Sequence, residues 1–145
     1  MNQDTINALK DKFPEQITGM TSFRGEETVT VRRESLIEIA GCLRDELDFE
    51  FLMDLTAVDY PEREERFEMV YNFYSFKNNL RLRIKAPVNG KEPVIASLAP
   101  LWSGANWFER EVYDMFGIKF EGHPDLRRIL MYDTFIGHPL RKDYP

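Results

Sequence analysis

The chain has 145 residues, of which 43% are hydrophobic and 13% aromatic, and its formal net charge is −6. A chain of this length supports one compact core, and this composition excludes a disordered chain. The acidic balance argues against sequence-independent binding to nucleic acid, which needs a basic face, so we expect no nucleic-acid partner.

The negative charge lies in the body of the chain. Residues 1–120 carry 21 acids and 15 bases, whereas residues 121–145 carry four of each. Residues 44–68 are the most acidic part, with ten acids and three bases, and we interpret them as solvated surface.

The single cysteine, Cys42, excludes an internal disulfide and cannot supply the four thiolates that an iron-sulfur cluster needs. This indicates a reducing compartment, and we interpret Cys42 as a small buried hydrophobe. The sequence has no leader-like N-terminus and no run of eighteen apolar residues. We therefore expect a cytoplasmic chain that reaches a membrane only through a partner.

In chain order, the first half predicts two helices and two strands. Ile6, Leu9 and Phe13 recur at helical spacing before Pro14, and strands are expected over 17–23 and through Val29 and Val31, joined by a turn at residues 24–25. Ser35-Leu-Ile-Glu38 has the pattern of a capping box. It precedes an amphipathic helix on whose apolar face Leu36, Ala40, Leu43 and Leu47 lie.

The second half begins with three predicted strands. One lies within residues 49–60, and the next begins at Phe67 and is apolar enough on both faces to be central in a sheet. In the third, Leu80, Leu82 and Ile84 alternate with Arg81, Arg83 and Lys85, which gives one core face and one basic face. The basic face is either ordinary solvent-exposed surface or a docking surface for an acidic partner.

Two helices are predicted after these strands. One covers residues 94–102, where Pro100 cuts it short. The other is capped by Ser103 and closed by Gly117, and it is expected to bury Phe108, Val112 and Met115.

Catalytic or metal-binding chemistry has little support in the residue pattern. The sequence has neither a G-x-G-x-x-G turn nor a P-loop. His123 and His138, with Asp125 and Asp133 between them, are a conceivable metal site, but each histidine precedes a proline and is therefore in extended backbone. We expect structural histidines, no metal site and no catalytic residue. The carboxylates of the last helix have the pattern of a solvated or ion-paired face.

Three segments carry a resemblance to a known family. They are ANWFEREVYDMFGIKFEGHPDLRRIL at residues 105–130, GHPLRKDYP at 137–145, and LTAVDYPERE followed by FEMVYNFYS within 55–75. Their order and spacing resemble the family of the C subunit, or thirty-kilodalton subunit, of respiratory complex I, the proton-translocating NADH:quinone oxidoreductase.

The resemblance implies a fold and a role. The fold is an α+β, two-layer α/β domain with a mixed, largely antiparallel sheet, helices on one face and an extended C-terminal arm. The role is that of a non-catalytic, peripheral subunit on the cytoplasmic side of the bacterial inner membrane. It holds no cofactor, whereas NADH, FMN, iron-sulfur clusters and quinone are bound by other subunits. Its partners are then the large quinone-site subunit and the iron-sulfur subunits.

On this basis we divide the chain into a core, residues 1–119, and a docking arm, residues 120–145, within one structural domain. The arm and the last helix are expected to meet partner subunits, although ion pairs within the chain are an equal alternative for the helix. The expected interface residues are Glu109, Arg110, Glu111, Asp114, His123, Arg127, Arg128, His138, Arg141 and Lys142. The alternatives are the equivalent subunit of a membrane-bound nickel-iron hydrogenase or related quinone oxidoreductase, and an unrelated enzyme that uses both histidines with a metal.

Overall fold

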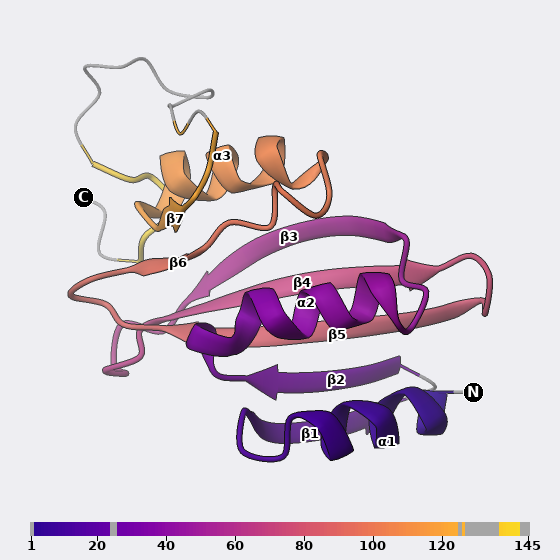
Figure 1. Cartoon of the computed structure of the whole chain (residues 1–145). Coiled ribbons are helices and arrows are strands. Elements are labelled where there is room, and N and C mark those ends of the chain that lie inside the picture. The colour runs from indigo at the N-terminus through magenta and orange to yellow at the C-terminus, as the bar shows by residue number, and fades with distance from the viewer. Residues whose placement is uncertain (1, 24–25, 125, 127–136, 143–145) are drawn as a thin grey trace.

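The computed structural model describes residues 2–23, 26–124, 126 and 137–142. A five-stranded sheet forms one layer, and helices α1 and α2 lie across one of its faces, with α3 further along toward β3 (Figure 1). The elements are α1 (Asn2–Lys12), β1 (Ile17–Phe23), β2 (Glu26–Val31), a 3-10 turn η1 (Arg33–Ser35), α2 (Leu36–Asp45), β3 (Phe51–Asp59), β4 (Phe67–Ser75), β5 (Leu80–Val88), β6 (Val94–Ala96), α3 (Ala105–Phe116) and β7 (Lys119–Glu121). The expected α+β fold is confirmed.

The large sheet is mixed, with the strand order β1-β2-β5-β4-β3. Only β2 and β5 pair in parallel, whereas the other three neighbouring pairs in this sheet are antiparallel. The strand that begins at Phe67 lies between β5 and β3, as its two apolar faces predicted. The turn predicted at residues 24–25 lies outside the described residues.

The core lies between the sheet and the helices. On β4, alternate side chains at Phe67, Met69, Tyr71 and Phe73 are fully buried, because a strand turns every second side chain to the same face. They meet the apolar faces of the helices, where Leu9, Ile39 and Leu43 are also fully buried. Burying each large apolar side chain stabilises the fold by about 1.5–3 kcal/mol.

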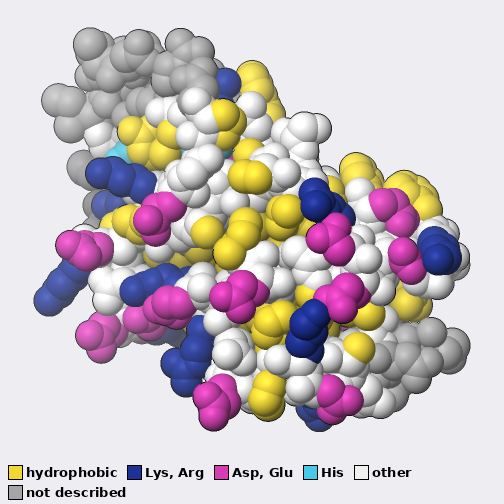
Figure 2. Space-filling view, viewed as in Figure 1, with side chains coloured by type: hydrophobic (Ala, Val, Ile, Leu, Met, Phe, Trp, Pro, Cys, Tyr) yellow, Lys and Arg dark blue, Asp and Glu magenta, His cyan; other side chains and the backbone are white. Residues whose placement is uncertain are grey.

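The surface of the helix-covered side carries acidic and basic side chains that are interspersed (Figure 2). Residues 61–65, within the most acidic part of the sequence, are all exposed. The interpretation of residues 44–68 as solvated surface therefore holds for residues 61–65, but it is wrong for Asp59, which is buried at 4% exposure. Cys42 is buried and free, as expected, and burial together with a hydrogen bond to Glu46 raises the pKa of its thiol to about 11.

Three local predictions are wrong. Ser35 makes no side-chain cap hydrogen bond, because a 3-10 turn leads into α2. Residues 94–102 form no helix, since Val94–Ala96 is a strand that pairs in parallel with β7. Ser103 was predicted to cap α3, but the N-cap residue is Gly104, and no side-chain hydrogen bond caps the helix.

The small sheet and α3 form one unit. Parallel strands need a crossover connection, and here α3 is the crossover between β6 and β7. Its last residue, Phe116, packs edge-on against Phe67 with ring centroids 6.3 Å apart, and Trp102 before the helix lies 5.0 Å from Phe73. The unit is thereby fixed against the sheet next to β3. From the sequence, we placed the boundary between core and arm between residues 119 and 120. In the structure, this position falls inside β7.

Candidate functional site

Helix α3 carries four of the expected interface residues, and two of them are inside the protein. Glu109 and Asp114 are fully buried at 0% exposure, whereas Arg110 and Glu111 are half-buried. The carboxylates of α3 were interpreted as a solvated or ion-paired face, and the solvated alternative is wrong for Glu109 and Asp114. Val112 is buried as predicted, and Phe108 and Met115 are only partly buried against the core.

The carboxylate of Glu109 fixes the segment that leads from β6 toward α3. Its Oε1 accepts a hydrogen bond from Ser97 Oγ at 2.6 Å, and its Oε2 accepts one from the Leu98 backbone N–H at 2.7 Å. Burial raises the pKa of Glu109 to about 7, although these two hydrogen bonds act in the opposite direction. Burial, followed by the charge of Glu109, also raises the pKa of Tyr71 well above its ordinary value.

His123 lies against the first turn of α3. Its Nε2 is 3.1 Å from the carbonyl oxygen of Asn106, and because a carbonyl only accepts, this ring nitrogen is the donor. The same Nε2 is 4.0 Å from Glu109 Oε1, and the His123 side chain is 1% exposed. The first Gly-His-Pro triplet therefore holds the chain after β7 against the beginning of α3.

The second triplet holds the other end of the same helix. His138 Nδ1 lies 3.0 Å from the carbonyl oxygen of Asp114, the Leu140 N–H donates to that of Met115 at 3.0 Å, and Arg141 Nε donates to that of Phe116 at 2.6 Å. The last carbonyl groups of a helix have no hydrogen-bond donor inside the helix, and this segment supplies a donor to three of them in succession. We call residues 137–142, which cap α3 in this way, the C-terminal clasp.

Gly117 makes the close approach of the clasp possible. Its φ is +80°, a left-handed conformation that ends α3 as predicted. A Cβ at this position would lie 2.7 Å from Arg141 Nη2 and 2.8 Å from two ring atoms of His138. A side chain would therefore displace the clasp as well as strain the backbone.

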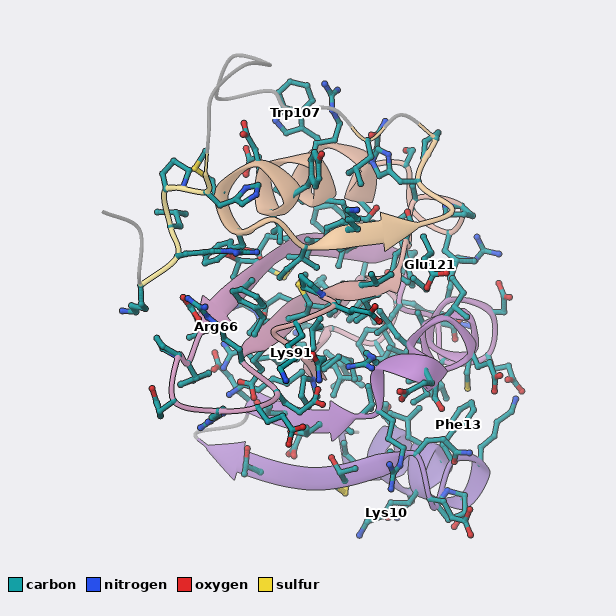
Figure 3. All side chains as sticks on the ribbon, turned by 90° about the vertical axis from the view of Figure 1, so that its left-hand side faces the viewer. Lys10, Phe13, Arg66, Lys91, Trp107 and Glu121 are labelled. Atoms are coloured by element: carbon teal, nitrogen blue, oxygen red, sulfur yellow. The ribbon has the colours of Figure 1, made fainter. Side chains whose placement is uncertain are left out.

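A buried ion pair holds the end of the clasp. The Lys142 N–H donates to Asp59 Oδ2 at 2.7 Å, while Arg66 Nε and Nη2 donate to the two oxygens of Asp59 at 2.6 and 2.8 Å. The side chain of Asp59 is 1% exposed. The guanidinium groups of Arg66 and Arg141 each lie 5.2 Å from the ring of Phe67. The clasp is thus joined to the ends of β3 and β4 (Figure 3, where Arg66 is labelled).

The outer side of α3 presents an aromatic side chain. Trp107 is 55% exposed and points away from the sheet (Figure 3). The guanidinium of Arg110 lies 5.4 Å from the centre of its ring. Tryptophan and arginine are enriched among the residues that dominate binding energy at interfaces.

The ten expected interface residues therefore fall into three groups. Glu109, Asp114, His123, His138 and Arg141 are buried or hydrogen-bonded within the chain; Arg110, Glu111 and Lys142 lie nearer the surface; and Arg127 and Arg128 lie outside the described residues. Sequence reasoning missed Asp59, Arg66, Ser97 and Trp107. The sequence did contain a signal for Trp107. Residues three apart are neighbours on the surface of a helix, and Arg110 follows Trp107 by three.

In the part of the chain that the structure describes, no group of three histidine, cysteine, aspartate or glutamate side chains is placed to hold a metal ion. Likewise, none of the described helices has the length and apolar character needed to cross a membrane.

Comparison with known proteins identifies the family. Residues 29–145 match the family of the respiratory-chain NADH dehydrogenase 30-kilodalton subunit. The NADH-quinone oxidoreductase C subunit of Citrifermentans bemidjiense is 49% identical over 144 residues, which are 99% of this chain and 89% of that one. The NADH-quinone oxidoreductase C/D subunit of Bdellovibrio bacteriovorus is 48% identical over 136 residues, which are 94% of this chain and 24% of that one.

A solved structure agrees with this. The trypsin-resistant fragment of Nqo5 matches with a TM-score of 0.76 and 32% identity, covering 87% of this chain and all of that one. These relatives do not favour the hydrogenase alternative. The chain belongs to the family of the respiratory-chain NADH dehydrogenase 30-kilodalton subunit.

Proposed function

We propose that this chain is the C subunit of an NADH-quinone oxidoreductase and that it acts in the peripheral arm without performing a chemical step itself. The family match over residues 29–145 carries the proposal. In this proposal, NADH, FMN, the iron-sulfur clusters and the quinone are bound by other subunits. The chain reaches the cytoplasmic side of the membrane only through the complex.

The large quinone-site subunit is the partner that we propose first, followed by the iron-sulfur subunits. Support comes from the Bdellovibrio relative, whose name joins the C and D subunits in one polypeptide of which this chain matches 24%. Two sequences that are covalently joined in one organism are candidates for neighbours where they are separate.

We propose that the contact surface consists of the outer side of α3, with Trp107 and Arg110, and the arm at residues 120–145. The exposed ring and the guanidinium beside it have the composition of an interface centre. Glu109, His123, His138 and Arg141 support this surface from inside the chain, because their hydrogen bonds hold α3 and both described ends of the arm together.

Deletion of the gene in the source organism, followed by complementation, tests this function. Membranes without the chain are expected to lose NADH-dependent quinone reduction, and the wild-type chain is expected to restore it. The variant Trp107→Ala is expected to restore it less well than the control Lys91→Ala, since Lys91 is exposed in the loop between β5 and β6. Unchanged quinone reduction in the deletion strain contradicts the proposal.

A further inference from the structure

An aromatic cluster lies on the face of the large sheet that the helices do not cover. Phe51 and Phe76 are 45% and 65% exposed, and the ring of Phe76 lies 5.7 Å from that of Phe51 and 4.9 Å from that of Tyr74. The next residues along the strands, Leu52 and Phe73, are buried in the core on the opposite face. The cluster therefore belongs to the open face.

Arg81 completes the cluster. Phe51 pairs with Tyr74 across β3 and β4, and Tyr74 pairs with Arg81 across β4 and β5, so these side chains form one row across three strands. With Met53 and Phe76 they line a shallow hollow of about 250 Å³. We call the hollow lined by Phe51, Met53, Tyr74, Phe76 and Arg81 the aromatic hollow. It lies toward the turn between β4 and β5, at the end of the sheet opposite residues 137–142 (Figure 1).

The three basic residues of β5 differ in their partners. Arg83 donates to Asn72 Oδ1 at 3.1 Å and lies 3.8 Å from Glu26, while Lys85 lies 3.6 Å from Glu68. Arg81 is exposed and makes no ion pair or side-chain hydrogen bond with the described residues. It is the one charged residue in the lining of the aromatic hollow. An unpaired guanidinium beside exposed aromatic rings is a site for a carboxylate flanked by an apolar group.

We propose that the aromatic hollow binds a segment of another subunit of the same complex that presents an aspartate or glutamate next to an apolar side chain. The proposal rests on the proposed function. The apolar side chain packs against Phe51 and Phe76, and the carboxylate accepts paired hydrogen bonds from the Arg81 guanidinium. A basic segment is excluded by repulsion from Arg81, and an entirely apolar one leaves that guanidinium desolvated without a partner.

Two other occupants fit the charges less well. An anionic membrane surface is disfavoured because the neighbouring hollow of the same face carries three carboxylates, Glu26, Glu27 and Asp54, against two guanidinium groups, Arg81 and Arg83. A second copy of this chain in a symmetric pair brings the same patch onto itself, which places Arg81 near its own counterpart.

Photo-cross-linking within the assembled complex tests the inference. A benzophenone-bearing amino acid replaces Phe76 in a tagged chain, and in a control chain it replaces Lys91, which is also exposed. After irradiation, the complex is purified through the tag, its subunits are identified, and the cross-linked peptide is sequenced. The probe at position 76 is expected to label one partner subunit at a segment where a carboxylate adjoins an apolar residue.

The role of Arg81 is tested in the same experiment. Arg81→Glu is expected to lower the yield of this cross-link at least about tenfold, since placing like charges together opposes binding, whereas Lys91→Glu leaves it unchanged. Because Arg81 is exposed, thermal unfolding of Arg81→Glu is expected to match that of the wild type.

The outcomes separate the two proposals. If the complex is recovered normally but the probe at position 76 labels nothing, or labels lipid or a second copy of the chain, the inference is overturned and the proposed function stands. A cross-link that persists in Arg81→Glu also overturns it. If the tagged wild-type chain recovers none of the other oxidoreductase subunits, the proposed function fails and the inference fails with it.

Discussion

His123 and His138 bind opposite ends of the same helix. Nε2 of His123 lies 3.1 Å from the carbonyl oxygen of Asn106 in the first turn of α3, and Nδ1 of His138 lies 3.0 Å from that of Asp114 in the last turn. The two Gly-His-Pro triplets thus hold the described parts of the arm to one helix, whose outer side carries Trp107.

His138 is expected to stabilise the fold through this contact. His138→Ala removes the hydrogen bond to the last turn of α3 and is predicted to lower the free energy of unfolding by about 1–2 kcal/mol. The matched control is Leu140→Ala, because that side chain is 54% exposed and the backbone N–H of residue 140 remains. Urea unfolding of the purified chains measures both. Equal stability of the two variants contradicts the capping role.

Gly117 is expected to tolerate no side chain. Gly117→Ala is predicted to destabilise the chain by about 1–2 kcal/mol or more, because its φ is +80° and the new Cβ meets Arg141 and His138. A Cβ added to Gly41, within α2, would have nothing within 4 Å, so Gly41→Ala is predicted to stabilise by about 0.5–1 kcal/mol. Thermal unfolding of both variants gives the comparison, and opposite signs are expected.

Asp59 is expected to be a main anchor of the clasp. Asp59→Ala leaves Arg66 without its buried partner and removes the acceptor for the Lys142 N–H, with a predicted cost of about 3 kcal/mol. The exposed pair of Arg33 and Glu65 is the control, since Glu65→Ala is predicted to cost less than about 1 kcal/mol. Denaturant unfolding measures both variants, and similar costs for the two pairs would be evidence against the anchor.

Glu109 gives the stability of the chain a pH dependence. Its pKa in the folded chain is about 7, above the ordinary value of 4.5, so the folded state holds the proton more strongly than the unfolded state. The resulting stabilisation is complete below pH 4.5 and is lost as the pH rises through 7. Relative to Glu109→Gln, the wild type is predicted to lose about 3 kcal/mol over this interval.

Unfolding free energies of the wild type and Glu109→Gln, measured from pH 4 to 8, check this prediction. In a third chain, Ser97→Ala removes a hydrogen bond that lowers the pKa of Glu109, so the loss is predicted to move to higher pH. Parallel curves for the wild type and Glu109→Gln would show that Glu109 does not titrate in this range.

Local patterns in the sequence predicted most of the large sheet and its helices. The alternation of Leu80, Leu82 and Ile84 with basic residues, and the helical spacing of Ile6, Leu9 and Phe13, depend only on neighbours along the chain. The αL glycine at 117 was predictable for the same reason, since a helix pattern ended there.

The interior of the site depends on contacts between distant segments and was not predictable in this way. Residues 94–96 form a strand that pairs with residues 119–121, and Ser97 and Leu98, which follow this strand, donate hydrogen bonds to Glu109. Without that pairing, a helix with Glu109, Arg110 and Glu111 has the pattern of a solvated or ion-paired face. Asp59 and Lys142 are 83 positions apart, and no local pattern relates them.

Affinity purification of the tagged chain from mildly solubilised membranes, with mass-spectrometric identification of the co-purifying proteins, tests the central claim most directly. We predict recovery of the quinone-site, iron-sulfur and flavin subunits of one NADH-quinone oxidoreductase with the wild-type chain, in defined proportions. Recovery of the chain alone, or with hydrogenase subunits in their place, would contradict the proposed function.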